Sequence, residues 1–326
     1  MAPALAHAPF HRDGWTYEEK VDGWRLIVYK DGPRVRLISR NGVDHTGRFP
    51  ELAATIAKLQ PQVLVLDGEV AVFDEQLVSR FHLLGESNSE DLCTPPMFIG
   101  FDVLQVGRRD LRADPLERRR PILEDAIAGS ELVLPVRRLE PSGAKAWEIV
   151  EGRGLEGFVA KDPRSVYRSG PTRLWVKVKL RHERVFVVGG LRAADGLGGV
   201  LVGERVGDEL QYRGVVEWGV HAADRLELTA GPAQPVSPFA DLRTMRGAVW
   251  LAPRLHAEIS YAEIAAGRLR APVWRGLVRL GDQMLRGVRG HQFCGREAET
   301  LVQNGGRLKA NRREQGEGGD RGDRFA

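Results

Sequence analysis

Apolar and polar residues alternate along the first part of the chain, which is the pattern of a β-strand with one buried face. The alternation runs from Trp15 to Ser39, and turns at Asp22-Gly23 and Lys30-Asp31-Gly32-Pro33 interrupt it. The second turn is typical of a hairpin. We therefore expect Lys20 to lie on a tight connection between two strands.

The same pattern predicts further elements as far as residue 179. Apolar runs predict strands at 63–73, which Asp67-Gly68-Glu69 interrupts, at 97–104, at 156–161 and at 173–179. Helical spacing and capping signals predict helices over 51–60, from Asp114-Pro115 through Ile127, and from Ser142 to near Gly154.

The pattern of apolar residues and glycines changes after Arg181. Short apolar segments broken by glycines follow one another, among them VFVVGGL, GGVLVGERV and LQYRGVV. Such a series predicts a small barrel or sandwich. From Gln303 the chain is rich in glycine and charge and has little to bury, which predicts disorder. We expect one domain over 1–180, a second over 181–302 and a tail over 303–326.

The composition is that of a globular protein. Hydrophobic residues make up 42% and charged residues 28% of the 326 residues, and no apolar run approaches the ~18 residues of a membrane helix. The first residues do not form a secretory signal. Cys93 and Cys294 are too few for a four-cysteine zinc site or a disulfide framework. We expect a cytoplasmic protein without zinc and without a membrane span.

Basic residues show two biases. The first 180 residues hold 26 basic and 26 acidic groups, so the net charge of +4 comes from the C-terminal part. This excess suits a polyanionic partner, and equally a slightly basic surface in solvent. The chain also has 40 arginines and only 8 lysines. Because lysine can lose its proton and act as a nucleophile whereas arginine cannot, each lysine is a candidate for chemistry.

The pattern Lys20-x-Asp22-Gly23-x-Arg25 is the strongest local signal. One interpretation is a β-turn whose charges lie in solvent. The other is an activated lysine, since a lysine with an ordinary pKa near ~10.4 attacks phosphorus only when cations or a metal lower that pKa. Arg25 is the expected cation. Gly23 is expected to let the backbone turn tightly and approach a nucleotide closely.

Five later motifs follow this pattern. They are Ser39-Arg40-Asn41-Gly42, Leu66-Asp67-Gly68-Glu69, Phe101-Asp102, Glu156-Gly157-Phe158-Val159-Ala160-Lys161 and Trp175-Val176-Lys177-Val178-Lys179. Together the six resemble, in order, the motifs of the covalent nucleotidyltransferase superfamily, and specifically of ATP-dependent DNA ligases. The resemblance implies an α+β nucleotidyltransferase domain, with antiparallel sheets and flanking helices around an ATP cleft, followed by an OB-fold barrel.

The resemblance also implies roles for single residues, with Lys20 as the carrier of AMP. The residues implied to contact the nucleotide are Glu18, Lys20, Arg25, Arg40, Glu69, Phe101, Arg173, Lys177 and Lys179, and Phe101 is the one that stacks on adenine. Glu69 and Glu156 are hard oxygen donors that can hold Mg²⁺ or Mn²⁺. Lys177 and Lys179 alternate with valines, which places both ammonium groups on one face of a strand.

The stretch from Gly267 to Leu277 resembles the L-R-x-P-x-(aromatic)-x-G-L segment of the short bacterial ligases associated with end joining. The family continues with an arginine and then Asp-Lys, which engage the leaving pyrophosphate. Here Val278-Arg279-Leu280-Gly281-Asp282-Gln283 follows, and the lysine is absent. We therefore expect slow self-adenylylation, or an enzyme that arrives already charged with AMP.

The predicted function is ATP-dependent sealing of DNA breaks with a 5′-phosphate and a 3′-hydroxyl through a lysyl-AMP, in DNA repair or end joining. ATP and Mg²⁺ or Mn²⁺ are the expected cofactors. The expected partners are double-stranded DNA with nicks or ends and an end-binding protein or repair polymerase, for a monomer found at the nucleoid when on DNA. An mRNA-capping guanylyltransferase or RNA ligase is the nearest alternative. A catalytically impaired nucleic-acid-binding protein is the alternative of another class.

Overall fold

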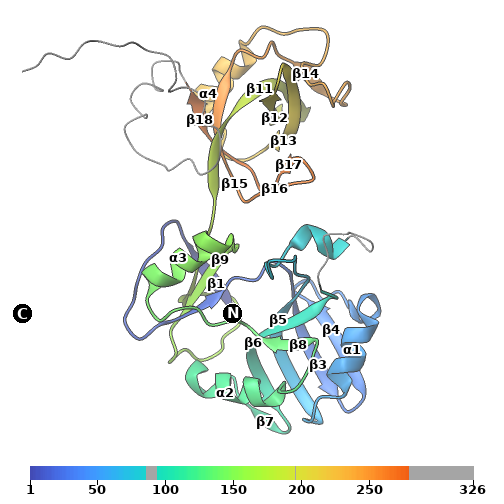
Figure 1. The fold of residues 1–326 in the computed structure, drawn as a ribbon, viewed down its shortest axis with the longest axis vertical. Helices are drawn as coiled ribbons and strands as arrows, with labels where there is room; N and C mark the ends of the chain where they lie inside the picture. The colour runs from blue at the N-terminus through green and yellow to red at the C-terminus, as the bar shows by residue number, and fades with distance from the viewer. Residues whose placement is uncertain (86–93, 195, 279–326) are drawn as a thin grey trace, which may run out of the picture. The chain divides into compact units, whose positions relative to one another are not determined.

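The computed structural model describes residues 1–85, 94–194 and 196–278. Strands and a few helices are mixed along these residues, which confirms the predicted α+β class (Figure 1). No helix among the described residues is long and apolar enough to cross a membrane. The predicted tail over 303–326 and residues 279–283 of the C-terminal motif lie outside the described residues.

The larger of two sheets before residue 180 has the strand order β4-β3-β5-β6-β7, with β8 beside β6. Its strands are β3 (Trp24–Asp31), β4 (Arg34–Ser39), β5 (Val63–Ala71), β6 (Met97–Val106), β7 (Arg109–Asp110) and β8 (Val133–Pro135).

The interruption that the sequence predicted within 63–73 is wrong, because strand β5 continues through Asp67-Gly68-Glu69. A Cβ at Gly68 would lie 2.4 Å from the ring of Phe98. Another side chain at Gly68 would therefore clash with the neighbouring strand β6, and the pairing of β5 with β6 shifts register between Asp67 and Gly68.

One face of this sheet carries the core of the N-terminal part. Buried residues at alternate positions of β3 and β5, such as Leu26 and Leu66, pack with Ile56 and Leu123 from the helices. These helices are α1 (Pro50–Ala57) and α2 (Leu116–Ala126), and both confirm predicted helices. The short 3₁₀ turns η1 (Thr46–Arg48) and η2 (Phe81–Gly85) lie in the connections. The opposite face of the sheet is therefore free to carry charged residues.

The smaller sheet has the strand order β1-β10-β9-β2. Its strands are β1 (Ala2–Ala6), β2 (Thr16–Glu19), β9 (Gly157–Lys161) and β10 (Pro171–Lys179), and α3 (Gly143–Arg153) lies beside β9 (Figure 1). Helix α3 follows Ser142 and ends at Gly154, whose φ of 64° is left-handed. The capping signals in the sequence predicted both of these ends. The pairings β1 with β10 and β6 with β8 are parallel, so the expected antiparallel arrangement holds for the other pairs only.

The part after residue 180 consists mainly of strands, as its pattern predicted, but the expected breaks at glycines are wrong for β11 and β12, which continue through their glycines over 13 and 11 residues. One sheet has the order β13-β12-β11-β15-β18, with β14 beside β11 and a separate hairpin of β16 and β17. Buried residues such as Val188, Val202, Ile259 and Trp274 form its core. The elements are β11 (His182–Ala194), β12 (Gly196–Val206), β13 (Glu209–Val216), α4 (Ala222–Thr229), β14 (Ala248–Trp250), β15 (His256–Tyr261), β16 (Ile264–Ala265), β17 (Arg268–Leu269) and β18 (Val273–Val278).

Gly23 ends the short connection from β2 to β3 on which Lys20 lies. A Cβ at this position would lie 2.3 Å from the carbonyl oxygen of Val70 and 3.2 Å from the Cβ of Ala71. The structural reason for this glycine is thus the close approach of the neighbouring strand, which differs from the expected approach of a nucleotide.

We expect Gly23→Ala to lower the free energy of unfolding by about 1–3 kcal/mol, because the added methyl group forces the connection away from β5. Gly47→Ala is the matched control, since a Cβ at Gly47 meets no atom within 4 Å and its φ is not left-handed. Urea unfolding followed by circular dichroism measures both variants. Equal losses of stability in the two variants would contradict this account of Gly23.

Candidate functional site

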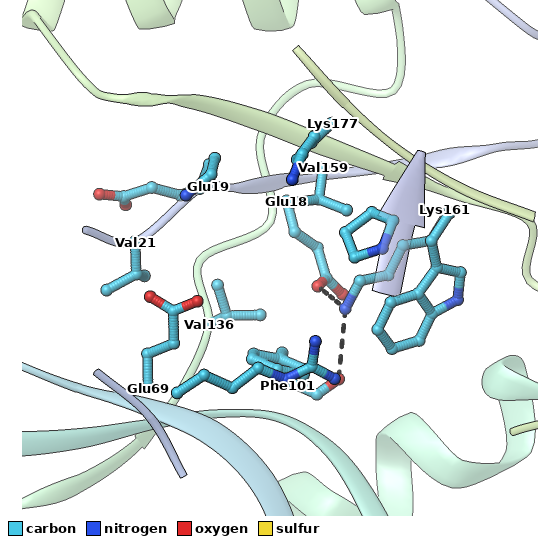
Figure 2. A pocket seen from close by; sticks show the side chains of 13 residues that line it. Glu18, Glu19, Val21, Glu69, Phe101, Val136, Val159, Lys161 and Lys177 are labelled. Atoms are coloured by element: carbon cyan, nitrogen blue, oxygen red, sulfur yellow. Dashed lines mark hydrogen bonds and ion pairs between the residues drawn. The ribbon is translucent and has the colours of Figure 1, made fainter. Parts of the chain in front are cut away.

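A cavity lies between the charged face of the larger sheet and the smaller sheet, and both sheets line it. Figure 2 shows Glu18 and Lys161 pointing toward each other on one side of this cavity and Glu69 on the other. The cavity contains six of the residues proposed from the motifs, namely Glu18, Lys20, Arg25, Glu69, Phe101 and Lys177. Its further lining residues are Pro3, Glu19, Val21, Val136, Val159, Lys161 and Trp175.

Strand alternation delivers the charged residues of the larger sheet to this cavity. Arg25 and Glu69 are paired neighbours across the β3 and β5 ladder, and Asp67 lies two residues before Glu69 on the same face. The residues between them, Leu26 and Gly68, face the core side. Charged and apolar side chains are therefore separated onto the two faces of one sheet.

The lysine motif of β10 shows the same separation. Val176 and Val178 are buried, whereas Lys177 lines the cavity and Lys179 forms an ion pair beside it. The prediction that both ammonium groups lie on one face of this strand is confirmed. Trp175 shares that face and also lines the cavity.

Lys20 lies against Glu156, the residue that precedes β9. The Lys20 Nζ is 2.5 Å from Glu156 Oε2, and the Lys179 Nζ is 2.9 Å from Glu156 Oε1. The side chains of Lys20 and Glu156 are only 15% and 10% exposed, so water screens this pair weakly. One carboxylate thus holds two of the motif lysines together.

The carboxylates around Lys20 favour its charged form. Burial works to lower the pKa of Lys20, but Glu156, Glu69 and Asp22 outweigh it and leave that pKa above its ordinary value. The lysines in turn favour the charged form of Glu156. Burial works to raise the pKa of Glu156, but Lys20 and Lys179 hold that pKa below its usual range. These charges therefore keep the side chain of Lys20 as an ammonium group.

The expectation that Arg25 lowers the pKa of Lys20 is wrong for the free protein. The guanidinium of Arg25 donates from Nε to Asp67 Oδ1 at 3.0 Å and from NH2 to Asp67 Oδ2 at 2.6 Å. Because Asp67 is fully buried and neutralises this charge, Arg25 is not among the main influences on Lys20. The Lys20-x-Asp22-Gly23-x-Arg25 pattern by itself does not predict that Arg25 pairs with Asp67.

Glu18, a predicted nucleotide contact, belongs to a network with Lys161 and Arg120, to which the sequence analysis gave no role. Lys161 Nζ lies 2.5 Å from Glu18 Oε2, and Arg120 NH1 lies 3.0 Å from Glu18 Oε1. The Lys161 ammonium also lies over the rings of Trp175, at 4.0 Å, and Phe101, at 4.8 Å. Lys161 ends the E-G-x-V-x-K motif and is one of only eight lysines, so both signals could have marked it.

Three proposed nucleotide contacts do not line this cavity: Lys179, which pairs with Glu156 beside it, Arg40 and Arg173. Arg40 is exposed and lines a neighbouring cavity, of which Arg25 forms the shared wall. Arg173 is exposed on β10 and lines neither cavity. The residues between Arg173 and the lysines place it toward the start of the strand, away from Lys20, so its proposed contact has no support from this geometry.

A metal site of three or more His, Cys, Asp or Glu side chains does not occur among the described residues. Mg²⁺ does not require one, because it binds through one or two carboxylates together with water and substrate phosphates. Glu69 and Glu156 both act electrostatically on Lys20 and on each other. These two carboxylates beside Lys20 fit the needs of such an ion.

Comparison with protein families agrees with the geometry of this cavity. Residues 4–179 match the ATP dependent DNA ligase domain, and residues 193–279 match the ATP dependent DNA ligase C terminal region. The chain belongs to the ATP-dependent DNA ligase family. The first match contains both sheets and all six motifs, and the second contains the strands from β12 to β18.

Individual family members are similar over most of the chain. The multifunctional non-homologous end joining protein LigD of Mycolicibacterium smegmatis is 33% identical over 85% of this chain, which spans only 38% of that relative. DNA ligase C1 of the same organism is 31% identical over 86% of this chain and 87% of its own length. The crystal structure of the ligase domain from M. tuberculosis LigD has a TM-score of 0.51 at 32% identity, over 85% of this chain and 94% of that domain.

Glu69 generates a prediction about stability and pH. Burial raises its pKa to about 7, with Lys20 lowering it and Glu156 raising it further. Since the folded protein holds this proton more tightly than the unfolded chain, the contribution of Glu69 to stability is present at acidic pH and is lost as the pH rises through 7.

We therefore expect the stability of Glu69→Gln relative to the unmodified protein to improve between pH 5 and pH 8, by up to roughly 3 kcal/mol. Urea unfolding at several pH values measures this difference. Glu148→Gln, which changes an exposed carboxylate on α3, is the control and should give a difference independent of pH. A stability difference for Glu69→Gln that does not change with pH would show that Glu69 has the same pKa in the folded and unfolded chains.

Proposed function

We propose that this chain joins a DNA 5′-phosphate to a 3′-hydroxyl with ATP as the source of energy, through AMP bound covalently to Lys20. The observation that carries this proposal is the position of Lys20 at a cavity that aromatic and apolar residues line together with the motif lysines Lys161 and Lys177. Membership of the ATP-dependent DNA ligase family supports it.

In the proposed reaction the neutral amine of Lys20 attacks the α-phosphorus of ATP. A phosphorus–nitrogen bond forms, the bond to the bridging oxygen breaks, and pyrophosphate leaves. An oxygen of the DNA 5′-phosphate then attacks the AMP phosphorus and releases Lys20. The 3′-hydroxyl finally attacks the activated 5′-phosphorus, loses its proton and displaces AMP.

Cations around the phosphates would stabilise these displacements. Lys177 lines the cavity, and burial together with the charges of Lys179 and Lys20 lowers its pKa. Negative charge develops on the oxygens of the transferred phosphoryl group, so ammonium groups aimed there lower the barrier. Lys177 and Lys179 are our candidates for this role.

Lys20 must lose a proton before it attacks, and Glu156 and Glu69 oppose that loss. We infer that ATP binding changes this balance, because ligands that engage these carboxylates remove their stabilisation of the ammonium form. Mg²⁺ held by Glu69 and Glu156 would supply positive charge beside the α-phosphate. Of the two carboxylates, Glu156 contacts Lys20 directly. A ligand bound to Glu156 would therefore have the larger effect on the pKa of Lys20.

The network of Glu18, Lys161 and Arg120 favours adenine over guanine. Adenine carries an amino donor at its six position, where guanine carries a carbonyl acceptor. The carboxylate of Glu18 accepts hydrogen bonds and is held in place by Lys161 and Arg120. We propose that Glu18 accepts from the adenine amino group while Phe101 provides the apolar face. A preference for adenine over guanine would distinguish an ATP-dependent ligase from a capping guanylyltransferase.

We propose DNA repair or end joining as the setting, because relatives at 33% identity carry end joining in their names. Sealing assays on matched nicked, gapped and blunt-ended duplexes, with Mg²⁺ or Mn²⁺, would identify the substrate. A domain boundary near residue 180, an end-binding protein or repair polymerase as partner, a monomeric state and a cytoplasmic location stay predictions. An absence of sealing with pre-adenylylated DNA would favour the impaired nucleic-acid-binding alternative.

Lys20→Ala should abolish the covalent AMP adduct and reduce nick sealing by at least about a thousandfold, since no other residue is expected to replace the nucleophile. Labelled ATP followed by denaturing electrophoresis detects the adduct. Lys145→Ala removes an exposed lysine of α3 and should behave as the unmodified protein does. Unchanged sealing by Lys20→Ala would refute the proposed mechanism.

Glu18→Gln should lower the preference for ATP over GTP by about tenfold or more, because an amide can donate to the guanine carbonyl. The measurement is the ratio of AMP adduct to GMP adduct formed by one protein sample. This ratio cancels any loss of folded protein that follows when Lys161 and Arg120 lose their charged partner. A GMP adduct without an AMP adduct in the unmodified protein would instead support the guanylyltransferase alternative.

A further inference from the structure

We propose that Tyr167 is a positioning residue that holds Arg25 in the wall of the nucleotide cavity by donating a hydrogen bond to the Asp67 carboxylate, which also binds Arg25. The inference rests on the proposed function for the identity of the nucleotide. Tyr167 belongs to none of the six motifs and lies in the connection between β9 and β10.

Three side chains form a continuous chain of hydrogen bonds here. The Tyr167 hydroxyl donates to Asp67 Oδ2 at 2.7 Å. The same oxygen accepts from Arg25 NH2 at 2.6 Å, while Asp67 Oδ1 accepts from Arg25 Nε at 3.0 Å. Asp67 is fully buried, so its carboxylate depends on these donors in place of water. Its orientation, and with it that of Arg25, is set by both partners.

Arg25 lies where its orientation affects two cavities. It lines the cavity that contains Lys20 and forms part of the neighbouring cavity that contains Arg40. Its guanidinium also lies over the ring of Phe101, at 5.2 Å from the ring centre. A shift of Arg25 would therefore disturb both the proposed base-stacking residue and the charged wall of the cavity.

The backbone around Tyr167 is anchored strongly enough to act as a fixed support. The Tyr167 amide donates to the carbonyl of Arg112 at 2.8 Å. Two residues earlier, the carbonyl of Ser165 accepts from the Leu116 amide at 3.0 Å and from Arg119 NH1 at 2.9 Å. Arg119 is itself fully buried in an ion pair with Asp102. The phenol thus reaches Asp67 from a segment tied to the start of α2.

The electrostatics favour the phenol as a permanent donor. Burial and the adjacent carboxylate of Asp67 raise the pKa of Tyr167, so its hydroxyl keeps its proton across the physiological range. A protonated phenol donates one hydrogen bond to the carboxylate, and phenylalanine cannot. Removing the hydroxyl alone therefore tests the hydrogen bond without removing the ring, which packs near Trp175 and Leu116.

Tyr167→Phe is expected to weaken ATP binding and raise the KM for ATP in Lys20 adenylylation by about tenfold, with a much smaller change in kcat. Calorimetry measures the Kd, and adduct formation at varied ATP measures KM and kcat. The matched control is Tyr29→Phe. Tyr29 and Tyr167 line the same outer cavity, but Tyr29 is 46% exposed and its hydroxyl makes no hydrogen bond to any described residue. This control should match the unmodified protein.

A double-mutant cycle distinguishes positioning from plain stabilisation. In an Arg25→Lys background the bidentate pair with Asp67 is lost, so adding Tyr167→Phe should produce little further change in the Kd for ATP. A fall in melting temperature with an unchanged Kd would overturn the inference and leave Tyr167 a structural residue. So would fully additive effects of the two substitutions.

Failure of the proposed function has a different signature. A protein that binds ATP but forms no adduct at Lys20 would contradict the lysyl-AMP mechanism. The ratio of Kd values for Tyr167→Phe and the unmodified protein would still decide the role of Tyr167, because it does not depend on adduct formation.

Discussion

The ion pairs of Glu156 with Lys20 and Lys179 are the interaction on which the candidate site depends. Lysines placed in a partly dry cleft repel one another and lose hydration, so a shared carboxylate is required to keep them there. Glu156 precedes β9, Lys20 follows β2, and Lys179 ends β10. The pairing therefore joins three segments of the smaller sheet at one point beside the cavity.

The same pairing keeps Lys20, the proposed nucleophile, protonated. Lys20 is surrounded by Glu156, Glu69 and Asp22, which raise its pKa although burial acts against them. In the proposed function, a substrate that brings phosphates and a divalent cation would change that environment, since it would compete for the carboxylates and supply its own charges. Under the proposed function, Lys20 would therefore stay protonated and unreactive until the nucleotide binds.

The pairing of strands and the burial of side chains decide which motif residues meet in the cavity. Arg25 and Glu69 arrive together because β3 and β5 are neighbours and their side chains alternate between two faces. Lys161 was named only as part of a motif, yet it is buried against Glu18 and two aromatic rings. Arg173 belongs to the same strand as the motif lysines but is exposed and outside the cavity. Membership of a strand did not ensure a place in the site.

The sequence by itself determined the α+β class, most of the strands and helices and the identity of the motif lysines, because strand alternation, helix caps and lysine scarcity are local signals. The tertiary structure decided which charges meet. Arg25 pairs with Asp67 across 42 positions of the chain, and Tyr167 reaches the same carboxylate across 100. Such partners depend on how strands are paired and connections anchored, and no local pattern records them. For that reason the expected influence of Arg25 on Lys20 was wrong.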